Sequence, residues 1–161
     1  MKWVLVHIVI LWFLPFQNLE PLRLAYKEAG QDDTKISHFM DLVKDITKDS
    51  SPVLIGYKGA ALAIEAKSQK GIPNKIEAFK EGKDYIEYAI EKDSTNIELR
   101  FIRIGIQENA PKILGYNNNI DEDKQFLLEH FNNITSKNLK NHISDYIKQS
   151  KIFTNEEKNS I

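Results

Sequence analysis

The fold is decided by residues 52–92, which read PVLIGYKGAALAIEAKSQKGIPNKIEAFKEGKDYIEYAIEK. In the first half of this stretch, small side chains that would let a second helix approach closely recur at Gly56, Gly59, Ala60, Ala63 and Ala66. In the second half, steps of three and four place on one helical stripe Phe79, Gly82, Ile86, Ala89 and Ile90. Between the halves lies Gly71-Ile72-Pro73, where glycine can end a helix and proline cannot continue one. The stretch therefore predicts two antiparallel helices, at 52–70 and 74–92.

Helix-start residues divide the rest of the chain in a similar way. Ser51 precedes Pro52, whose fixed φ suits the first helical position. Capping-box spacing relates Asn74 to Glu77, Thr95 to Glu98, and Asn119 to Glu122. No segment alternates convincingly at period two, and no Asn-Gly or Asp-Gly turn joins two apolar runs. We therefore predict an all-α protein of antiparallel hairpins, stacked as a short solenoid or an irregular bundle. Further helices are expected at 20–29, 34–48, 96–109, 120–134 and 136–150, in a single domain over 19–153 with a frayed tail at 154–161.

The beginning of the chain differs from the rest in composition. Lys2 precedes an apolar run from Trp3 to Phe16. This run of about 14 residues is shorter than the roughly 20 needed to span a bilayer, but it fits the apolar region of a signal peptide. His7 interrupts the run, and no Ala-x-Ala-like pair of small residues follows it. We expect residues 1–18 to be a signal peptide or hydrophobic leader, with an uncleaved membrane anchor or a buried helix as alternatives.

Composition narrows the classes of function. The 161 residues include 22 basic and 23 acidic side chains, mixed along the chain, for a net charge of −1. This mixture lacks the positive field of nucleic-acid-binding proteins, so no nucleic-acid partner is expected. The absence of cysteine excludes disulfides, thiolate metal sites and a lipoprotein anchor. Richness in Ile, Asn and Lys is typical of an AT-rich bacterial genome, which together with the leader predicts a periplasmic or secreted protein.

Part of the chain resembles a tetratricopeptide repeat. Gly82, Ile86 and Ala89 have the spacing of the second repeat helix, and 93–96 read Asp-Ser-Thr-Asn, similar to the family's Asp-Pro-x-Asn turn. Residues 54–57, Leu-Ile-Gly-Tyr, resemble the first-helix signature, although Tyr57 follows glycine directly and the unit is several residues too long. The resemblance covers roughly 52–109 and, more loosely, 96–134. It implies a short solenoid whose inner helices line a groove for a protein or peptide; a hairpin without repeat ancestry is the alternative.

The candidate binding residues lie mainly in 96–116. Apolar residues occur nearly all round this helix, which predicts a central position, at Ile97, Leu99, Phe101, Ile102, Ile104 and Ile106. Arg100, Arg103 and Gln107 nevertheless share one stripe. Because the guanidinium fork matches a two-oxygen anion, these three residues and Tyr57 are the candidate ligand- or partner-binding site. The alternative is that the arginine stems lie on the core with their heads in water, or that the arginines pair internally with Glu65, Glu77 or Glu98.

No catalytic or metal-binding residues are predicted. The acidic cluster Asp121-Glu122-Asp123 lacks the order of ligands in a calcium-binding loop, and it suits the dipole of a helix's first turn. His38, His130 and His142 lack the paired spacing of a helical zinc site. Nucleophile-elbow, phosphate-loop and dinucleotide fingerprints are also missing, so no cofactor is expected.

These patterns favour an exported helical binding or scaffold module that recognises a protein or peptide through a groove lined by its central helices. An accessory protein that binds a small carboxylate- or phosphate-bearing ligand is the alternative, and an enzyme is the third hypothesis. Contact with a membrane is expected only through an uncleaved leader, and the sequence does not determine the oligomeric state.

Overall fold

The computed structural model describes residues 18–161, so the predicted leader lies outside the described residues except for Asn18. The described chain is all-α, as predicted, and it contains no strand. Its helices are α1 (Glu20–Gln31), α2 (Ile36–Val43), α3 (Pro52–Glu65), α4 (Ile72–Lys92), α5 (Ile97–Asn109), α6 (Ile120–His130), α7 (Lys137–Gln149) and α8 (Asn155–Asn159). Short 3-10 turns lie at η1 (Asp33–Lys35), η2 (Ala66–Ser68), η3 (Lys112–Leu114) and η4 (Phe131–Asn133).

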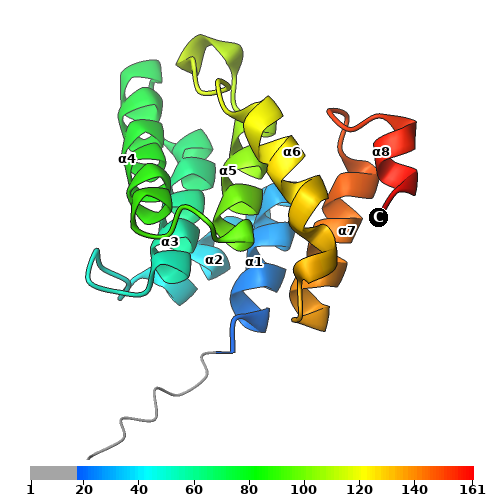
Figure 1. Ribbon diagram of the computed structural model, residues 1–161. Coiled ribbons are helices and arrows are strands. Elements are labelled where there is room, and N and C mark those ends of the chain that lie inside the picture. Colours follow the sequence, from blue (N-terminus) through cyan, green and yellow to red (C-terminus); the bar gives the residue numbers. More distant parts are fainter. Residues whose placement is uncertain (1–17) are drawn as a thin grey trace, which may run out of the picture.

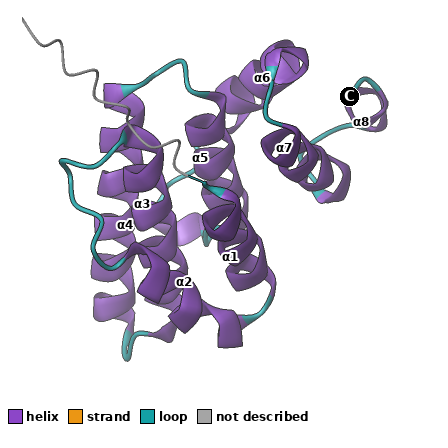
Figure 2. Cartoon of the chain, turned by 90° about the horizontal axis from the view of Figure 1, so that it is seen from below, coloured by secondary structure: helices purple, strands orange, loops and turns teal. Residues whose placement is uncertain are grey.

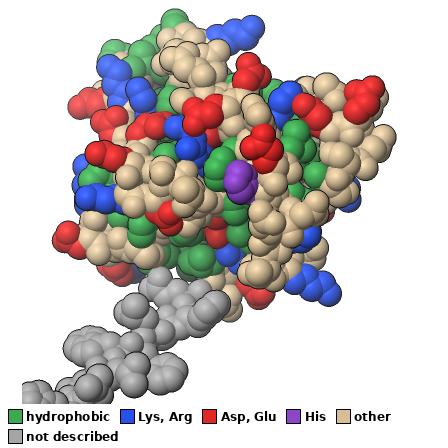
Figure 3. Space-filling view, viewed as in Figure 1, with side chains coloured by type: hydrophobic (Ala, Val, Ile, Leu, Met, Phe, Trp, Pro, Cys, Tyr) green, Lys and Arg blue, Asp and Glu red, His purple; other side chains and the backbone are tan. Residues whose placement is uncertain are grey.

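Helices α1 and α5 lie in the middle of the molecule, between the α3–α4 hairpin on one side and α6 to α8 on the other (Figures 1 and 2). Helix α3 contacts α1, α2, α4 and α5, while α7 contacts α1. On the face shown in Figure 3, acidic and basic side chains lie next to one another, in keeping with the mixed charge of the sequence. Within residues 18–161, no helix has the length and apolar character required to cross a membrane.

The α3–α4 hairpin has the close packing predicted from its small residues. A Cβ atom on Gly59 would lie 2.6 Å from the carbonyl oxygen of Gly82, and one on Gly82 would lie 2.5 Å from the backbone nitrogen of Ala63. The two backbones therefore meet where neither glycine leaves room for a side chain. Gly71 makes the turn with a φ of 84°, a value that glycine adopts without steric cost.

Helix α5 forms the centre of the core, as its apolar residues predicted. Leu99, Ile102 and Ile104 are fully buried, and Phe101 is nearly so. The ring of Phe101 meets that of Tyr26 on α1 edge-on, with 5.7 Å between centroids, an arrangement favoured for aromatic pairs. The core thus joins helices that are far apart in the sequence.

Helix boundaries depart from the predictions where local hydrogen bonding decides them. Helix α5 is capped by Asn96 instead of Thr95, because the Asn96 side chain accepts a hydrogen bond from the backbone N–H of Glu98 at 3.0 Å. Helix α4 begins before Asn74, since Pro73 fits the first turn without an N–H. Helix α2 ends at Val43, and hydrogen-bonded turns take up the residues that follow, up to Ser50.

The end of the chain also differs from the expected frayed tail. Thr154 and Glu157 form a reciprocal capping box, in which each side chain accepts a hydrogen bond from the backbone of the other, and this box begins α8. Glu157 also pairs with Lys124 of α6 at 3.1 Å, and Phe153 is buried. These contacts supply the anchoring that a terminal segment otherwise lacks.

Candidate functional site

The predicted arginine stripe is occupied by carboxylates of the protein itself. Arg103 binds Asp123 with both arms of its guanidinium group, at 2.7 and 2.6 Å, and it also contacts Glu87 at 3.1 Å. Arg100 donates to Asp123 at 3.0 Å and to Glu122 at 2.6 Å. Burial by itself lowers the pKa of Arg103, but the hydrogen bonds and charges of Asp123 and Glu87 outweigh it and raise the pKa. Both arginines are therefore paired with carboxylates of the protein itself.

A second buried ion pair holds the other predicted site residue, Tyr57. Arg23 of α1 binds Glu98 through two hydrogen bonds of 2.8 Å, and the Tyr57 hydroxyl donates to the same carboxylate at 2.7 Å. Burial, followed by the charge of Glu98, raises the pKa of Tyr57 well above its ordinary value. The tyrosine is thus a protonated donor in the core, with no surface for a partner to touch.

The structure does not bring Tyr57, Arg100, Arg103 and Gln107 together on an open groove. Tyr57, Arg103 and Gln107 are all buried. The arginines pair internally, which was the alternative expectation. Their partners are Glu87, Glu122 and Asp123. They are not the expected Glu65, Glu77 or Glu98. Glu122 and Asp123, in the first turn of α6, therefore also neutralise the two arginines of α5. Gln107 reaches Asn119 at 3.4 Å, and its carbonyl oxygen has no hydrogen-bond partner.

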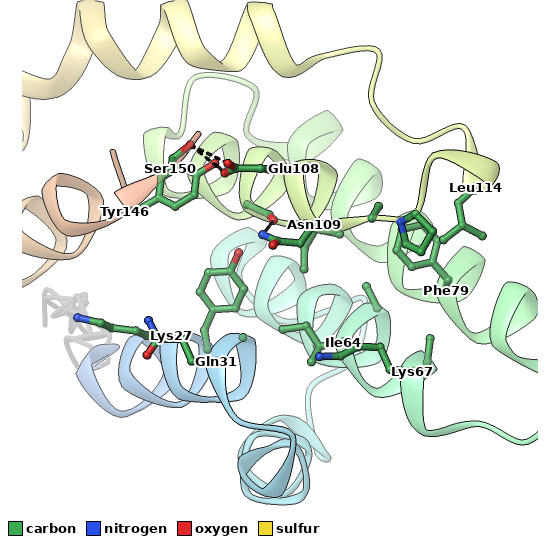
Figure 4. A pocket seen from close by; sticks show the side chains of 18 of the residues that line it. Lys27, Gln31, Ile64, Lys67, Phe79, Glu108, Asn109, Leu114, Tyr146 and Ser150 are labelled. Atoms are coloured by element: carbon green, nitrogen blue, oxygen red, sulfur yellow. Dashed lines mark hydrogen bonds between the residues drawn. The ribbon is translucent and has the colours of Figure 1, made fainter. Parts of the chain in front are cut away.

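The large hollow of the described structure is instead a cleft between α1, α3, α4, α5 and α7, with a volume of about 830 Å³ (Figure 4). Most of its inner wall is apolar or aromatic, formed by Tyr26, Ala63, Ile64, Ile76, Phe79, Phe101, Ile106, Leu114 and Tyr146. Polar side chains at its edges include Lys27, Gln31, Lys67, Lys75, Asn109 and Lys151.

At one end of the cleft, a carboxylate holds α7 and the following turn in place. Glu108 accepts hydrogen bonds from the Tyr146 hydroxyl at 2.8 Å, from the Ser150 hydroxyl at 2.9 Å, and from the backbone N–H of Lys151 at 2.9 Å. Figure 4 shows Tyr146 and Ser150 pointing toward Glu108. Burial and the charge of Glu108 raise the pKa of Tyr146, so its hydroxyl remains a donor. Hydrogen bonds to Glu108 therefore hold this wall of the cleft in place. The Ser150 hydroxyl donates to that carboxylate, and no histidine forms a hydrogen bond with it within residues 18–161.

Sequence reasoning missed the cleft because its walls come from five helices. Gly30 on α1 and Gly105 on α5 both line the hollow. A Cβ on Gly105 would collide with the hydroxyl of Tyr26, whereas one on Gly30 would meet no atom within 4 Å. Their partners across the space, however, were not predictable from spacing along one helix. Among residues 18–161, no group of three or more histidine or carboxylate side chains could hold a metal ion.

His142 on α7 also lines the cleft and makes stability depend on pH. Burial, then the positive charge of Lys27, lowers the pKa of His142 to about 4. Arg23 lowers it further, while Glu98 and Asp145 act in the opposite direction. The imidazole of His142 therefore takes up a proton at a higher pH in the unfolded chain than in the native protein. Its contribution to the free energy of unfolding is complete above the ordinary histidine pKa of about 6.5 and is lost as the pH falls toward 4.

Replacing His142 with phenylalanine is expected to remove that part of the pH dependence while keeping the ring contact with Phe101, which has 5.2 Å between centroids. Between pH 7 and about pH 4.5, the wild-type protein should lose about 2 kcal/mol more unfolding free energy than the variant. Urea denaturation at the two pH values measures this difference. Equal losses in the two proteins would show that His142 does not titrate differently on folding.

Comparison with known proteins finds no matching family model, no similar curated protein and no similar solved structure. The resemblance of 52–109 to a tetratricopeptide repeat therefore remains a prediction from the residues that carry it.

Proposed function

We propose that the protein is an exported helical module that binds a protein or peptide partner through the cleft between α1, α3, α4, α5 and α7. The observation that carries this proposal is that the apolar lining of the cleft includes side chains that are largely exposed to solvent. Ile72 and Ile113, which line its edge, are 72% and 88% exposed. A partner that covers both isoleucines and the adjoining cleft gains the free energy of burying a continuous apolar surface. Single isoleucines scattered over a protein surface do not offer such an area.

The lining of the cleft favours a peptide segment as the partner. Peptide segments commonly dock by laying an apolar face into a hydrophobic groove, with polar contacts around its edge. The cleft offers this combination, because aromatic and aliphatic residues form its floor while Gln31, Asn109 and several lysines stand at its margin. The proposed contact surface is therefore the cleft, and the buried arginine stripe has a structural role.

A small ligand with a carboxylate or phosphate group is the second candidate. Its support is the volume of about 830 Å³, which falls in the range of roughly 300–1,000 Å³ of small-molecule sites. Such a ligand would fill the hollow and leave Ile113 exposed. A ligand that raises the melting temperature equally in the wild type and in an Ile113→Ser variant would favour this candidate.

Export is the part of the proposal that rests on the leader. Its support is the apolar run from Trp3 to Phe16 after Lys2. In a bacterial host, fractionation should find the full-length chain outside the cytoplasm, and deletion of residues 2–16 should retain it inside. Cytoplasmic location of the full-length chain would contradict export without bearing on the cleft.

Photo-crosslinking in the cells that make the protein tests the binding function. A photoreactive amino acid at Gln31, which lines the cleft, should give a discrete adduct, whereas one at Glu91, exposed on α4 and outside the cleft, should not. Combining Ile72→Ser with Ile113→Ser should strongly reduce the Gln31 adduct.

The matched control for these substitutions is Leu24→Ser, since Leu24 is 57% exposed on α1 and does not line the cleft. All three side chains are exposed, so each replacement should change unfolding free energy by only about 0.5 kcal/mol. An adduct that survives the double isoleucine substitution, or falls equally with Leu24→Ser, would rule out the cleft as the contact surface.

A further inference from the structure

One end of the cleft carries a concentration of positive charge. Residues 66–80 and 110–115, which form the α3–α4 turn, the start of α4 and η3, contain five lysines and one glutamate. Their formal charge is +4, whereas the whole chain has a net charge of −1. When the flanking Glu65 and Glu81 are counted as well, five lysines and three glutamates leave a charge of +2, which is still opposite in sign to that of the whole chain.

These lysines are mostly not neutralised by the protein itself. Lys67 pairs with Asp33 at 2.8 Å, in a contact exposed to solvent. Lys75 donates to the backbone carbonyl of Lys67 at 2.8 Å and has no carboxylate within ion-pair distance in residues 18–161; the same holds for Lys70, Lys80 and Lys112. This contrasts with α5, where each arginine has a carboxylate partner.

The same end carries the exposed apolar surface. Ile72 begins α4 between Lys70 and Lys75, and Ile113 follows Lys112. A complementary surface therefore has to present apolar side chains and negative charge close together. A small apolar ligand meets only part of this requirement, because it offers no negative charge to the lysines.

We propose that the occupant of the cleft is an acidic, amphipathic segment of a partner protein. Its apolar side chains enter the cleft and cover Ile72 and Ile113, and its carboxylates lie over Lys67 and Lys75. This inference rests on the proposed binding function and adds the chemistry of the partner. Electrostatic complementarity of this kind selects among apolar segments and speeds association.

Two synthetic peptides of about 15 residues test the charge preference. Both carry leucine at steps of three and four, and the remaining positions are mainly glutamate in one peptide and lysine in the other. With the full-length protein, fluorescence anisotropy should give about tenfold tighter binding of the glutamate peptide at about 0.1 M salt. The ratio should shrink at about 1 M salt, where screening is stronger.

Charge reversal locates the effect. Lys67→Glu combined with Lys75→Glu should abolish or invert the preference for the glutamate peptide. The matched control is Lys44→Glu with Lys137→Glu, which makes the same change of charge at exposed positions outside the cleft and should leave the preference in place.

Three outcomes would overturn the inference. They are equal or tighter binding of the lysine peptide, no binding of either peptide, and self-association of the protein that disappears with Ile72→Ser and Ile113→Ser, which would make a second copy the occupant. Crosslinking from position 31 tests the binding function independently of the charge of the partner. A discrete adduct to another protein without a preference for the glutamate peptide refutes the acidic partner alone. If no adduct forms from position 31 while Ile72 and Ile113 are intact, the cleft itself is refuted as a binding site.

Discussion

Replacing Gly82 with alanine is expected to lower the free energy of unfolding by about 2 to 3 kcal/mol, because overpacking at a backbone contact forces two helices apart. The added Cβ would lie 2.5 Å from the backbone nitrogen of Ala63 and 2.6 Å from the carbonyl oxygen of Gly59. Backbone atoms cannot move aside as the end of a flexible side chain can, so α3 and α4 must separate. Urea denaturation followed by circular dichroism measures the loss.

The matched control is the same substitution at Gly30, near the end of α1. A Cβ at Gly30 meets no atom within 4 Å. Alanine is the better helix former, so Gly30→Ala should raise the unfolding free energy by about 0.5 to 1 kcal/mol. Opposite signs for the two variants are the expected result. A Gly82→Ala protein as stable as the wild type would show that the hairpin is less tightly packed than described.

Asp123→Asn should destabilise the protein by about 3 to 5 kcal/mol, the usual effect of removing one partner from a buried ion pair. Asp123 is fully buried and accepts hydrogen bonds from both Arg100 and Arg103. Asparagine keeps the shape of the side chain but not its charge, so the buried Arg103 is left with the half-exposed Glu87 as its nearest counterion. Chemical denaturation at neutral pH gives the difference.

Glu122→Gln serves as the comparison for this prediction. Glu122 also contacts Arg100, at 2.6 Å, but its side chain is 56% exposed, and water can replace the interaction. A change of about 1 kcal/mol or less is expected, as for other surface ion pairs. If the two variants lost equal stability, the greater weight assigned to the buried carboxylate would be wrong.

The elements predicted best from the sequence are those that local chemistry determines. The α3–α4 hairpin followed from the small residues around Gly59 and Gly82 and from the turn at Gly71. The central place of α5 followed from apolar residues all round it. Cap positions were less predictable, because Thr95 and Asn96 are both good caps and only the backbone geometry selects Asn96.

The candidate site was harder to predict than the fold. The stripe of Arg100 and Arg103 was visible in the sequence, but their partner Asp123 lies on another helix and no spacing rule links them. The cleft depends on α1, α5 and α7 meeting across long sequence separations. Exposure of Ile72 and Ile113 is likewise a property of the packed structure, since isoleucine is ordinarily assigned to a core.

The two buried ion pairs of α5 also restrict how the chain can assemble. An acidic side chain, Glu98, receives Arg23 from α1, and a basic one, Arg103, receives Asp123 from α6. A misfolded topology with α1 and α6 exchanged would set arginine against arginine and aspartate against glutamate. Like charges without water around them are strongly repulsive. The opposite polarity of the two contacts therefore disfavours the swapped arrangement.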